Sequence, residues 1–498
     1  MKLRKLIITL TIFSTTFSAC TKRLDSLLDN PNAPSLTTAD VDLFLNSEQL
    51  NFNGFWSNVG DIGGQLGRQQ QWGGPFYRNA YTPATFDGMW TTAYTGIINS
   101  ANALIPLAQA QKKYKQSGIA KVLKAYTLGT LVDCFGDVPY TEANLGAENL
   151  TPKVDGGASI YAAVITTLDD AIADFNKTGA AAGPTNDLFY PGGGSSNNYN
   201  AAKWITCAKT LKLKFLMQTR LVDASAKAKI QALLTENDLI NASSQDFQFQ
   251  YGANLSAPDS RHPHYAIDYV NTGGVGEYLS NYFMWMVVAE KYGGSATLTN
   301  AASDPRSRYY FYRQATNYAW VSQQSAPCAF QAAPPSWYPS VPDQTPYCLI
   351  GRGYMGRDHG DNSGAPPDGN FRTAWGVYPA GGKFDNNDNA TVKLGDGGGG
   401  RGINPIWLSS YTNFLKAEAA ITLATGADAR ALLNTGVGAS ITKVMGYPAT
   451  IGVTVPTAAV PSATQITNYT NLVLSRYDNA PDDSKRLNVI MSEYYFMG

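Results

Sequence analysis

The sequence AYTLGTLVDCFGDVPYTE, residues 125–142, decides how the rest of the chain is organised. Its apolar residues recur at helical spacing and predict one stripe that is buried against other helices: Tyr126, Leu128, Leu131, Val132 and Phe135. Gly136 predicts the end of this helix, because glycine adopts a positive φ without penalty and Pro139 cannot continue the helix. The chain must therefore turn directly after Phe135. Asp133 and Asp137 are interpreted as a solvated edge and a turn cap.

The composition indicates a folded chain with a neutral charge balance. At 498 residues and 44% hydrophobic content, the chain can bury a substantial core in one large domain or in a few smaller ones. Its 38 basic and 38 acidic residues cancel, so nothing indicates a nucleic-acid partner. Removal of a leader that contains Lys2, Arg4 and Lys5 would leave a net charge of −3.

Further helical patterns surround the opening segment. Apolar residues at helical spacing predict three helical pairs: 85–110 with 119–135, 159–175 with 200–221, and 407–423 with 427–444. Paired helices of this size suggest stacked tetratricopeptide-like units, although the consensus of that repeat is absent. Residues 25–82 are polar and Gly-rich, and we expect them to wrap the helices without long elements.

These patterns predict a mostly α-helical fold with a large irregular insertion. After a leader over residues 1–19, we expect a single domain over 20–498. Tetratricopeptide-like helical hairpins would form a scaffold over about 83–244 and 404–498. The stretch over about 245–403 is rich in Gly, Pro and aromatic residues and predicts a loop-rich subdomain inserted into that scaffold.

The N-terminus has the layout of a secretory signal peptide. Basic residues precede the apolar run over 6–13, and small residues lead to Cys20. A Cys directly after small residues resembles a bacterial lipobox, in which the Cys is lipidated, although Phe17 stands where lipoboxes prefer Leu. An ordinary secretory leader with Cys20 incidental is the alternative. No later apolar stretch is long enough to span a bilayer, so acyl chains on Cys20 would supply the membrane attachment.

Several motifs in order along the chain resemble the SusD/RagB family of nutrient-binding outer-membrane lipoproteins of Bacteroidota. They are the lipobox at Cys20, FGDVPY at 135–140, NAAKW at 200–204 leading into TLKL at 210–213, NFLKAEAA at 413–420, and GRGYMGRDHGDNSG at 351–364 with YPAGGKFD at 378–385. The family normally continues beyond a helix like the one expected over 484–496. The C-terminus is therefore expected to be short relative to the family.

The resemblance implies a function and partners. Members of this family resemble lids over a SusC-like TonB-dependent transporter in the outer membrane. They capture oligosaccharides, or in some cases peptides, and deliver them to the pore. The resemblance thus implies a lipid-anchored protein at the cell surface, although the residues 21–23 are not the acidic ones that favour surface display.

Aromatic residues in loops are the candidate ligand-binding residues. Sugars stack their apolar ring faces on Trp and Tyr, while polar groups satisfy the hydroxyls. We predict a binding site from Trp72 and Tyr77, before the first expected helix, together with Trp320, Trp337 and Tyr338 in the insertion. The alternative for each aromatic residue of the insertion is that it packs the small core of that subdomain.

Two other classes of function are weighed against binding of a nutrient. Asp358 and His359 beside Arg357 form the best acid–base cluster, and His262 and His264 form another, but neither lies beside a nucleophile motif or a cofactor fingerprint. We therefore predict no catalytic residue, with a glycan hydrolase as the alternative. The third class is an interaction protein that docks on a partner through its helical face.

A calcium site is one further hypothesis. Asp385, Asn387 and Asn389 alternate and Asp396 falls at the twelfth position, as oxygen ligands do in calcium loops. Ala390 stands in place of the Gly that such loops require, so an Asn- and Asp-rich turn is the alternative. No other cofactor is expected.

The cysteines divide into two groups. Cys328 and Cys348 lie in a Pro-rich loop of an exported chain, where a disulfide between them is plausible. Cys134 and Cys207 fall within helical patterns and are expected to be buried as small hydrophobes. The sequence contains no CxxC pair or Cys/His cluster that would indicate zinc.

Overall fold

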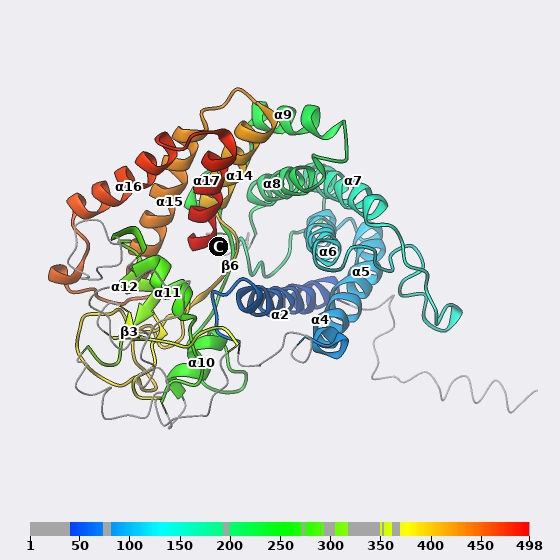
Figure 1. Ribbon diagram of the computed structural model, residues 1–498. Coiled ribbons are helices and arrows are strands. Elements are labelled where there is room, and N and C mark those ends of the chain that lie inside the picture. Colours follow the sequence, from blue (N-terminus) through cyan, green and yellow to red (C-terminus); the bar gives the residue numbers. More distant parts are fainter. Residues whose placement is uncertain are drawn as a thin grey trace, which may run out of the picture.

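A computed structural model describes residues 40–72, 81–192, 199–270, 274–288, 290–292, 304–316, 349–350, 353–360 and 369–497. Its helices form an arc, and the C-terminal end of the chain lies near the middle of the molecule (Figure 1). Strands are few and short in the described residues. The prediction of a mostly α-helical fold is confirmed.

The first half of the arc contains the first two of the three predicted helical pairs. Its elements are α2 (Val41–Leu66), η1 (Pro83–Phe86), α4 (Asp87–Thr91), the π-helical η2 (Thr92–Ile98), α5 (Asn99–Ala110), α6 (Tyr114–Phe135), η3 (Gly146–Glu148), α7 (Gly157–Asn176), α8 (Ala201–Thr219), α9 (Ala226–Glu236) and η4 (Ser243–Gln245). α5 packs on α6, and α7 packs on both α6 and α8. The helices stack on one another as the two expected hairpins require.

Helix α6 lies at the centre of this stack and is more deeply buried than the sequence indicates. Nearly every residue from Gln116 to Val132 is buried, so the helix has several buried faces and not one apolar stripe. Gly129 permits the close contact with α8, because a Cβ at this position would lie 2.2 Å from ring atoms of Phe215. The helix ends at Phe135, and Gly136 follows with a φ of 77°.

The two acidic residues around this helix end connect it to its neighbours. Asp137 Oδ1 accepts a hydrogen bond of 2.7 Å from the backbone nitrogen of Gly157 and so caps the first turn of α7. Asp133 forms an ion pair with Lys214 of α8 and accepts a hydrogen bond of 2.5 Å from Tyr161 of α7. Asp133 is exposed, as the interpretation of a solvated edge expects, and its carboxylate also joins three helices.

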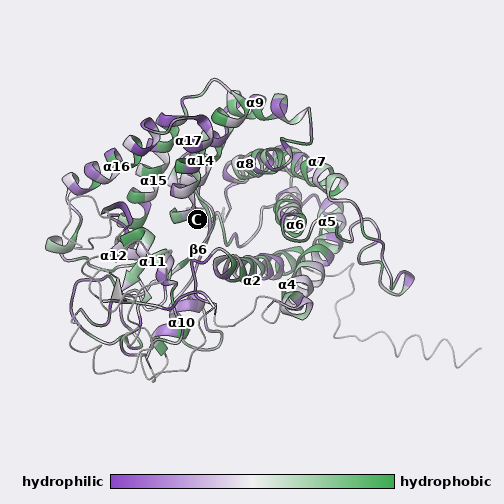
Figure 2. Ribbon diagram, in the orientation of Figure 1, coloured by the Kyte–Doolittle hydropathy of each residue, from purple (hydrophilic) through white to green (hydrophobic). Residues whose placement is uncertain are grey.

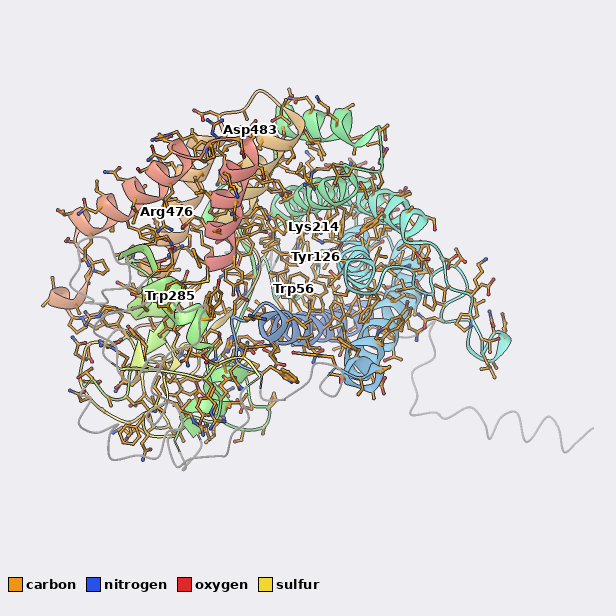
Figure 3. All side chains as sticks on the ribbon, in the orientation of Figure 1. Trp56, Tyr126, Lys214, Trp285, Arg476 and Asp483 are labelled. Atoms are coloured by element: carbon orange, nitrogen blue, oxygen red, sulfur yellow. The ribbon has the colours of Figure 1, made fainter. Side chains whose placement is uncertain are left out.

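Helix α2 contradicts the expectation that residues 25–82 contain no long element. It spans 26 residues, and Asp40 caps it by accepting a 2.8 Å hydrogen bond from the nitrogen of Asp42. Its buried residues include Val41, Leu45, Phe52 and Phe55, which pack against η2, α5 and α6. Trp56, Tyr126 and Lys214 lie between α2, α6 and α8 (Figure 3). The scaffold therefore begins well before residue 83.

The second helical block closes the arc. Its elements are α14 (Ser409–Leu423), α15 (Ala429–Thr450), η7 (Thr457–Ala459), α16 (Ala463–Asp478) and α17 (Asp483–Met497). Trp407 was expected to begin a helix. It is instead the last residue of a strand, and helix α14 begins at Ser409. α16 lies at the outer edge and is largely hydrophilic in Figure 2, with four buried residues: Tyr469, Val473, Leu474 and Tyr477.

The irregular stretch enters and leaves the scaffold at one place. β1 (Phe247–Gln250) pairs antiparallel with β6 (Ile403–Trp407), so the two ends of this stretch lie side by side. Its other elements are α10 (Pro263–Val270), α11 (Asn281–Val288), η5 (Glu290–Tyr292), α12 (Ser307–Tyr310), β2 (Phe311–Tyr312) paired with β5 (Ala374–Trp375), and β3 (Leu349–Ile350) paired with β4 (Tyr354–Met355). These elements gather on one side of the arc (Figure 1).

A buried polar network ties this stretch to the last helices. Arg306 and Asp304 are fully buried and form an ion pair of 2.6 Å. Arg306 also donates a 2.8 Å hydrogen bond to Ser440 of α15, and Lys291 pairs with Glu493 of α17 at 2.9 Å. Because each charge has a partner, this network holds the irregular stretch on the scaffold.

The described cysteines differ in their surroundings. Cys207 is buried, as expected, whereas Cys134 is exposed. The prediction for Cys134 is wrong because the last turn of α6 emerges from the helical stack.

None of the described helices has both the length and the hydropathy needed to cross a bilayer.

Candidate functional site

A row of six aromatic rings follows one edge of the helical scaffold. Neighbouring ring centroids lie 5.2–6.4 Å apart. In spatial order the members of this aromatic row are Trp72, Tyr81, Phe86, Phe135, Trp90 and Tyr94. All six side chains are half-buried, so each is packed on one side and accessible on another. Phe135, the last residue of α6, lies inside the row, and Tyr94 is its end.

Local structure explains why these rings line up. Phe86, Trp90 and Tyr94 are four residues apart in the continuous helical segment from η1 through η2, and this spacing places them on one face. Tyr94 donates a 2.6 Å hydrogen bond to the carbonyl of Pro139, which fixes the turn after α6 against it. Tyr81 donates a 3.1 Å hydrogen bond to Gln65 of α2. The rings are thus held before any ligand arrives.

His359 lies at the other end of the row, next to Trp72. The two ring centroids are 5.7 Å apart, and the nitrogen of Gly360 donates a 2.8 Å hydrogen bond to the carbonyl of Trp72. Burial and the nearby charge of Arg68 lower the pKa of His359. Asp358 accepts a hydrogen bond of 3.3 Å from Asn281. His359 therefore extends the row as a neutral ring.

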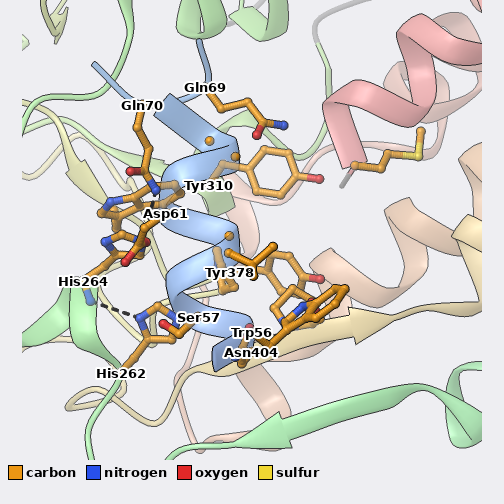
Figure 4. Close-up of a pocket in the computed structure, with 18 of the residues that line it drawn as sticks. Trp56, Ser57, Asp61, Gln69, Gln70, His262, His264, Tyr310, Tyr378 and Asn404 are labelled. Carbon is orange, nitrogen blue, oxygen red and sulfur yellow. Dashed lines mark hydrogen bonds and ion pairs between the residues drawn. The ribbon is translucent and has the colours of Figure 1, made fainter. Parts of the chain in front are cut away.

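A pocket of about 350 Å³ lies between α2, the irregular stretch and the C-terminal helix. Its wall has eight aromatic side chains: Trp56, Phe283, Tyr310, Phe311, Trp375, Tyr378, Tyr411 and Phe496. In Figure 4, Asp61, Gln70 and the two histidines lie on one side of α2, and Tyr310 and Tyr378 lie on the other. Gln69 and Gln70 line this pocket and precede Trp72 in the chain, so the pocket adjoins the aromatic row.

Two histidines in the pocket wall have opposite charge states. Burial would lower the pKa of His264, but the charge of Glu277 and a hydrogen bond with Asp61 outweigh it and raise the pKa to about 10. His264 lies 2.9 Å from Glu277 and 3.3 Å from Asp61, and its ring stacks on Trp375. Burial and the charge of His264 lower the pKa of His262. At neutral pH, His264 is charged and His262 is neutral.

The sequence-predicted ligand-binding residues are described in part. Trp72 belongs to the aromatic row, whereas Tyr77, Trp320, Trp337 and Tyr338 lie outside the described residues. Cys20, Cys328 and Cys348 also lie outside them. Among the described aromatic residues between 304 and 380, Tyr309, Tyr312 and Tyr354 are buried in the core, whereas Tyr310, Phe311, Trp375 and Tyr378 line the pocket.

Two of the four residues of the calcium hypothesis bind an arginine, and the other two bind elsewhere. Arg313 donates a 2.6 Å hydrogen bond to Asp385 and another to Asn387. Asn389 accepts a hydrogen bond of 2.7 Å from Thr316, and Asp396 accepts one of 3.1 Å from Lys393. Within the described ranges, no three His, Cys, Asp or Glu side chains converge as at a metal site. The calcium site stays a prediction, and the positive charge beside Asp385 is a guanidinium.

Most members of the aromatic row were not predicted as binding residues. Phe86, Trp90, Tyr94 and Phe135 have helical spacing, and this spacing indicates core positions. Their half-buried state depends on where the hairpin ends, which a single sequence does not reveal. The recurrence of an aromatic residue at every fourth position from Phe86 to Tyr94 is the signal that could have found them.

Comparisons with known proteins place the chain beside one family. The model of a SusD-like family, described as starch-binding and associating with outer membrane, matches residues 32–282, half of the chain. Comparison with curated proteins returns no match.

Solved structures share the fold at low sequence identity. A SusD homologue from Parabacteroides distasonis has a TM-score of 0.60 at 17% identity, over 92% of this chain and 81% of that chain. A SusD homologue from Bacteroides fragilis has a TM-score of 0.59 at 15% identity, over 92% and 84%. A chitin-binding SusD homologue from Flavobacterium johnsoniae has a TM-score of 0.56 at 16% identity, over 92% and 82%. These similarities show the fold.

Proposed function

Since the chain belongs to the SusD-like family, we propose that it captures oligosaccharides at the cell surface and passes them to a partner TonB-dependent outer-membrane transporter. The family is described as starch-binding, and one similar structure is that of a chitin-binding protein. Both descriptions concern carbohydrates. They support a glycan as the ligand class for this chain.

The aromatic row is the observation that carries this proposal. Each accessible ring face can stack on the apolar face of a sugar ring, and several rings in line suit a chain of sugars. Exposed polar side chains stand beside the rings, among them Thr82, Thr85 and Asp87. Such groups can form hydrogen bonds with the hydroxyls at the edges of the sugars.

Arg357 and Arg372 flank the ring of Tyr278, at 4.4 and 3.8 Å from its centroid.

The anchor and the transporter belong to the same proposal. Acyl chains on Cys20 would hold the protein on the outer membrane, and the helical scaffold would dock on a SusC-like transporter. Replacing Cys20 with Ala should release the protein from the membrane fraction without changing its glycan affinity. Retention of the Cys20→Ala protein on the membrane would contradict the lipid anchor.

We propose binding without turnover. The arrangement of Asp358 and His359, with the carboxylate bonded to Asn281 and the imidazole against Trp72, supports a structural role for both. Calorimetry against plant, host and microbial glycans and mixed peptides should give saturable heats with one glycan class and no reaction products by chromatography. Binding of peptides alone would replace the ligand class, and hydrolysis of any glycan would overturn the proposal of binding without turnover.

A further inference from the structure

The pocket beside α2 is kept open by glycines. Gly60 and Gly63 line it, and a Cβ added at either position would have no atom within 4 Å. Glycine inside a helix costs about 1 kcal/mol relative to Ala, so two in one exposed helical face weaken α2 without any packing gain. They leave access to the aromatic wall. This pocket is separate from the aromatic row, and its ligand chemistry is independent of the proposed function.

The wall of the pocket combines aromatic rings with an excess of negative charge. Asp61 lines the pocket, and its side chain is 41% exposed. His264 supplies one positive charge, but Asp61 and Glu277 both pair with it, so this cluster carries a net charge of −1. No lysine or arginine is among the described residues that line the pocket. The wall therefore favours a positive charge.

We propose that this pocket binds an organic ammonium ion with a compact apolar body. The faces of aromatic rings attract ammonium groups, and the attraction grows where water is excluded. Trp56, Tyr310 and Tyr378 line the pocket on one side of α2, and Asp61 supplies the neutralising charge on the other side, where Trp375 stacks on His264. A volume of about 350 Å³ lies at the lower end of the range for small-molecule sites. The pocket thus suits a small amine.

A series of three similar molecules with different charges tests the proposal. The probes are 2-phenylethylamine, 2-phenylethanol and phenylacetate, which are a cation, a neutral molecule and an anion at pH 7. Calorimetry on the full chain should show about tenfold tighter binding of the amine than of the alcohol, and the weakest binding for phenylacetate. Equal or weaker binding of the amine, or no binding of any probe, would overturn the proposal.

Variants connect the binding to this pocket. Gly63→Phe fills the open space and should abolish binding, whereas Gly54→Phe, on an exposed face of the same helix and outside the pocket, should not change it. Asp61→Asn removes the charge and should reduce the preference for the amine over the alcohol to about threefold or less. Circular dichroism checks whether each variant is folded. If Gly63→Phe does not fold, the test rests on Asp61→Asn. A preference of this variant for the amine over the alcohol that equals the wild-type preference contradicts the proposal.

Discussion

The imidazole of His264 and the carboxylate of Asp61 lie 3.3 Å apart and join the irregular stretch to helix α2. Glu277 approaches the other ring nitrogen at 2.9 Å, so His264 stands between two carboxylates. Its side chain is 12% exposed. A mostly buried imidazolium between two carboxylates contributes to holding the irregular stretch on helix α2.

Replacement of His264 by Gln should destabilise the protein and flatten the dependence of its stability on pH. The raised pKa of His264 means that its contribution is fully present below about pH 6.5 and is lost as pH rises toward about 10. The groups that act on it are Asp61, Glu277, Asp268 and His262. The wild-type advantage in free energy of unfolding, on the order of a few kcal/mol at pH 6.5, should shrink by pH 9.5.

Urea denaturation of both proteins at the two pH values measures this difference. His262→Gln is the control, because folded His262 is neutral at both values and its effect should differ between them by only about 0.4 kcal/mol. A wild-type advantage over His264→Gln that is constant from pH 6.5 to 9.5 would show that His264 is not held charged.

Gly129→Ala should destabilise the scaffold through α6. The added Cβ would lie 2.2 Å from atoms of the Phe215 ring, so α6 and α8 must separate or the ring must move. Overpacking of this kind costs about 1–3 kcal/mol. Gly438→Ala is the matched control, since it adds a Cβ to helix α15 with no atom within 4 Å and should be neutral or stabilising. Thermal unfolding that is equal for the two variants would contradict the close contact of α6 with α8.

The Asp385→Asn variant and a chelator together test whether Asp385 pairs with Arg313 or binds calcium. Asp385 and Arg313 are both buried, so removal of this carboxylate takes the opposite charge away from a buried guanidinium and should cost about 3 kcal/mol. With Arg313 as the partner, a chelator should leave the melting temperature of the wild-type protein unchanged. A lower melting temperature on chelation, restored by calcium, would support the calcium hypothesis instead.

Helix α2 shows where sequence reasoning failed on the fold. Its buried positions Val41, Leu45, Glu48, Phe52 and Phe55 keep helical spacing, and Asp40 is a good cap. Polar residues among the buried positions and the glycines of its second half obscured this pattern. Glu48 is buried, and desolvation raises its pKa well above the ordinary value of a glutamate. Charge state in the folded protein is not visible in the sequence.

Helices α5 to α8, α14, α15 and α17 could be predicted because their apolar spacing is regular, whereas α9, α10, α11 and α16 were not predicted. Gly136 ends α6, as the sequence indicates, and Asn200, expected as the first residue of a helix, caps α8. The pocket could not be predicted, because it joins segments that are far apart in the chain. Trp56 donates a 3.2 Å hydrogen bond to the carbonyl of Pro405, which lies 349 positions further along the chain, and no local pattern connects the two.

Titration of the mature protein with the glycan class found in the panel, compared with its Trp72→Ala variant, tests the account most directly. Loss of one stacked ring should lower the affinity about fivefold or more, since stacking contributes about 1 kcal/mol or more. Tyr114→Ala, at the opposite end of α6 from the aromatic row, is the control and should bind as the wild type does. An unchanged affinity in folded Trp72→Ala protein would contradict a binding site on the aromatic row.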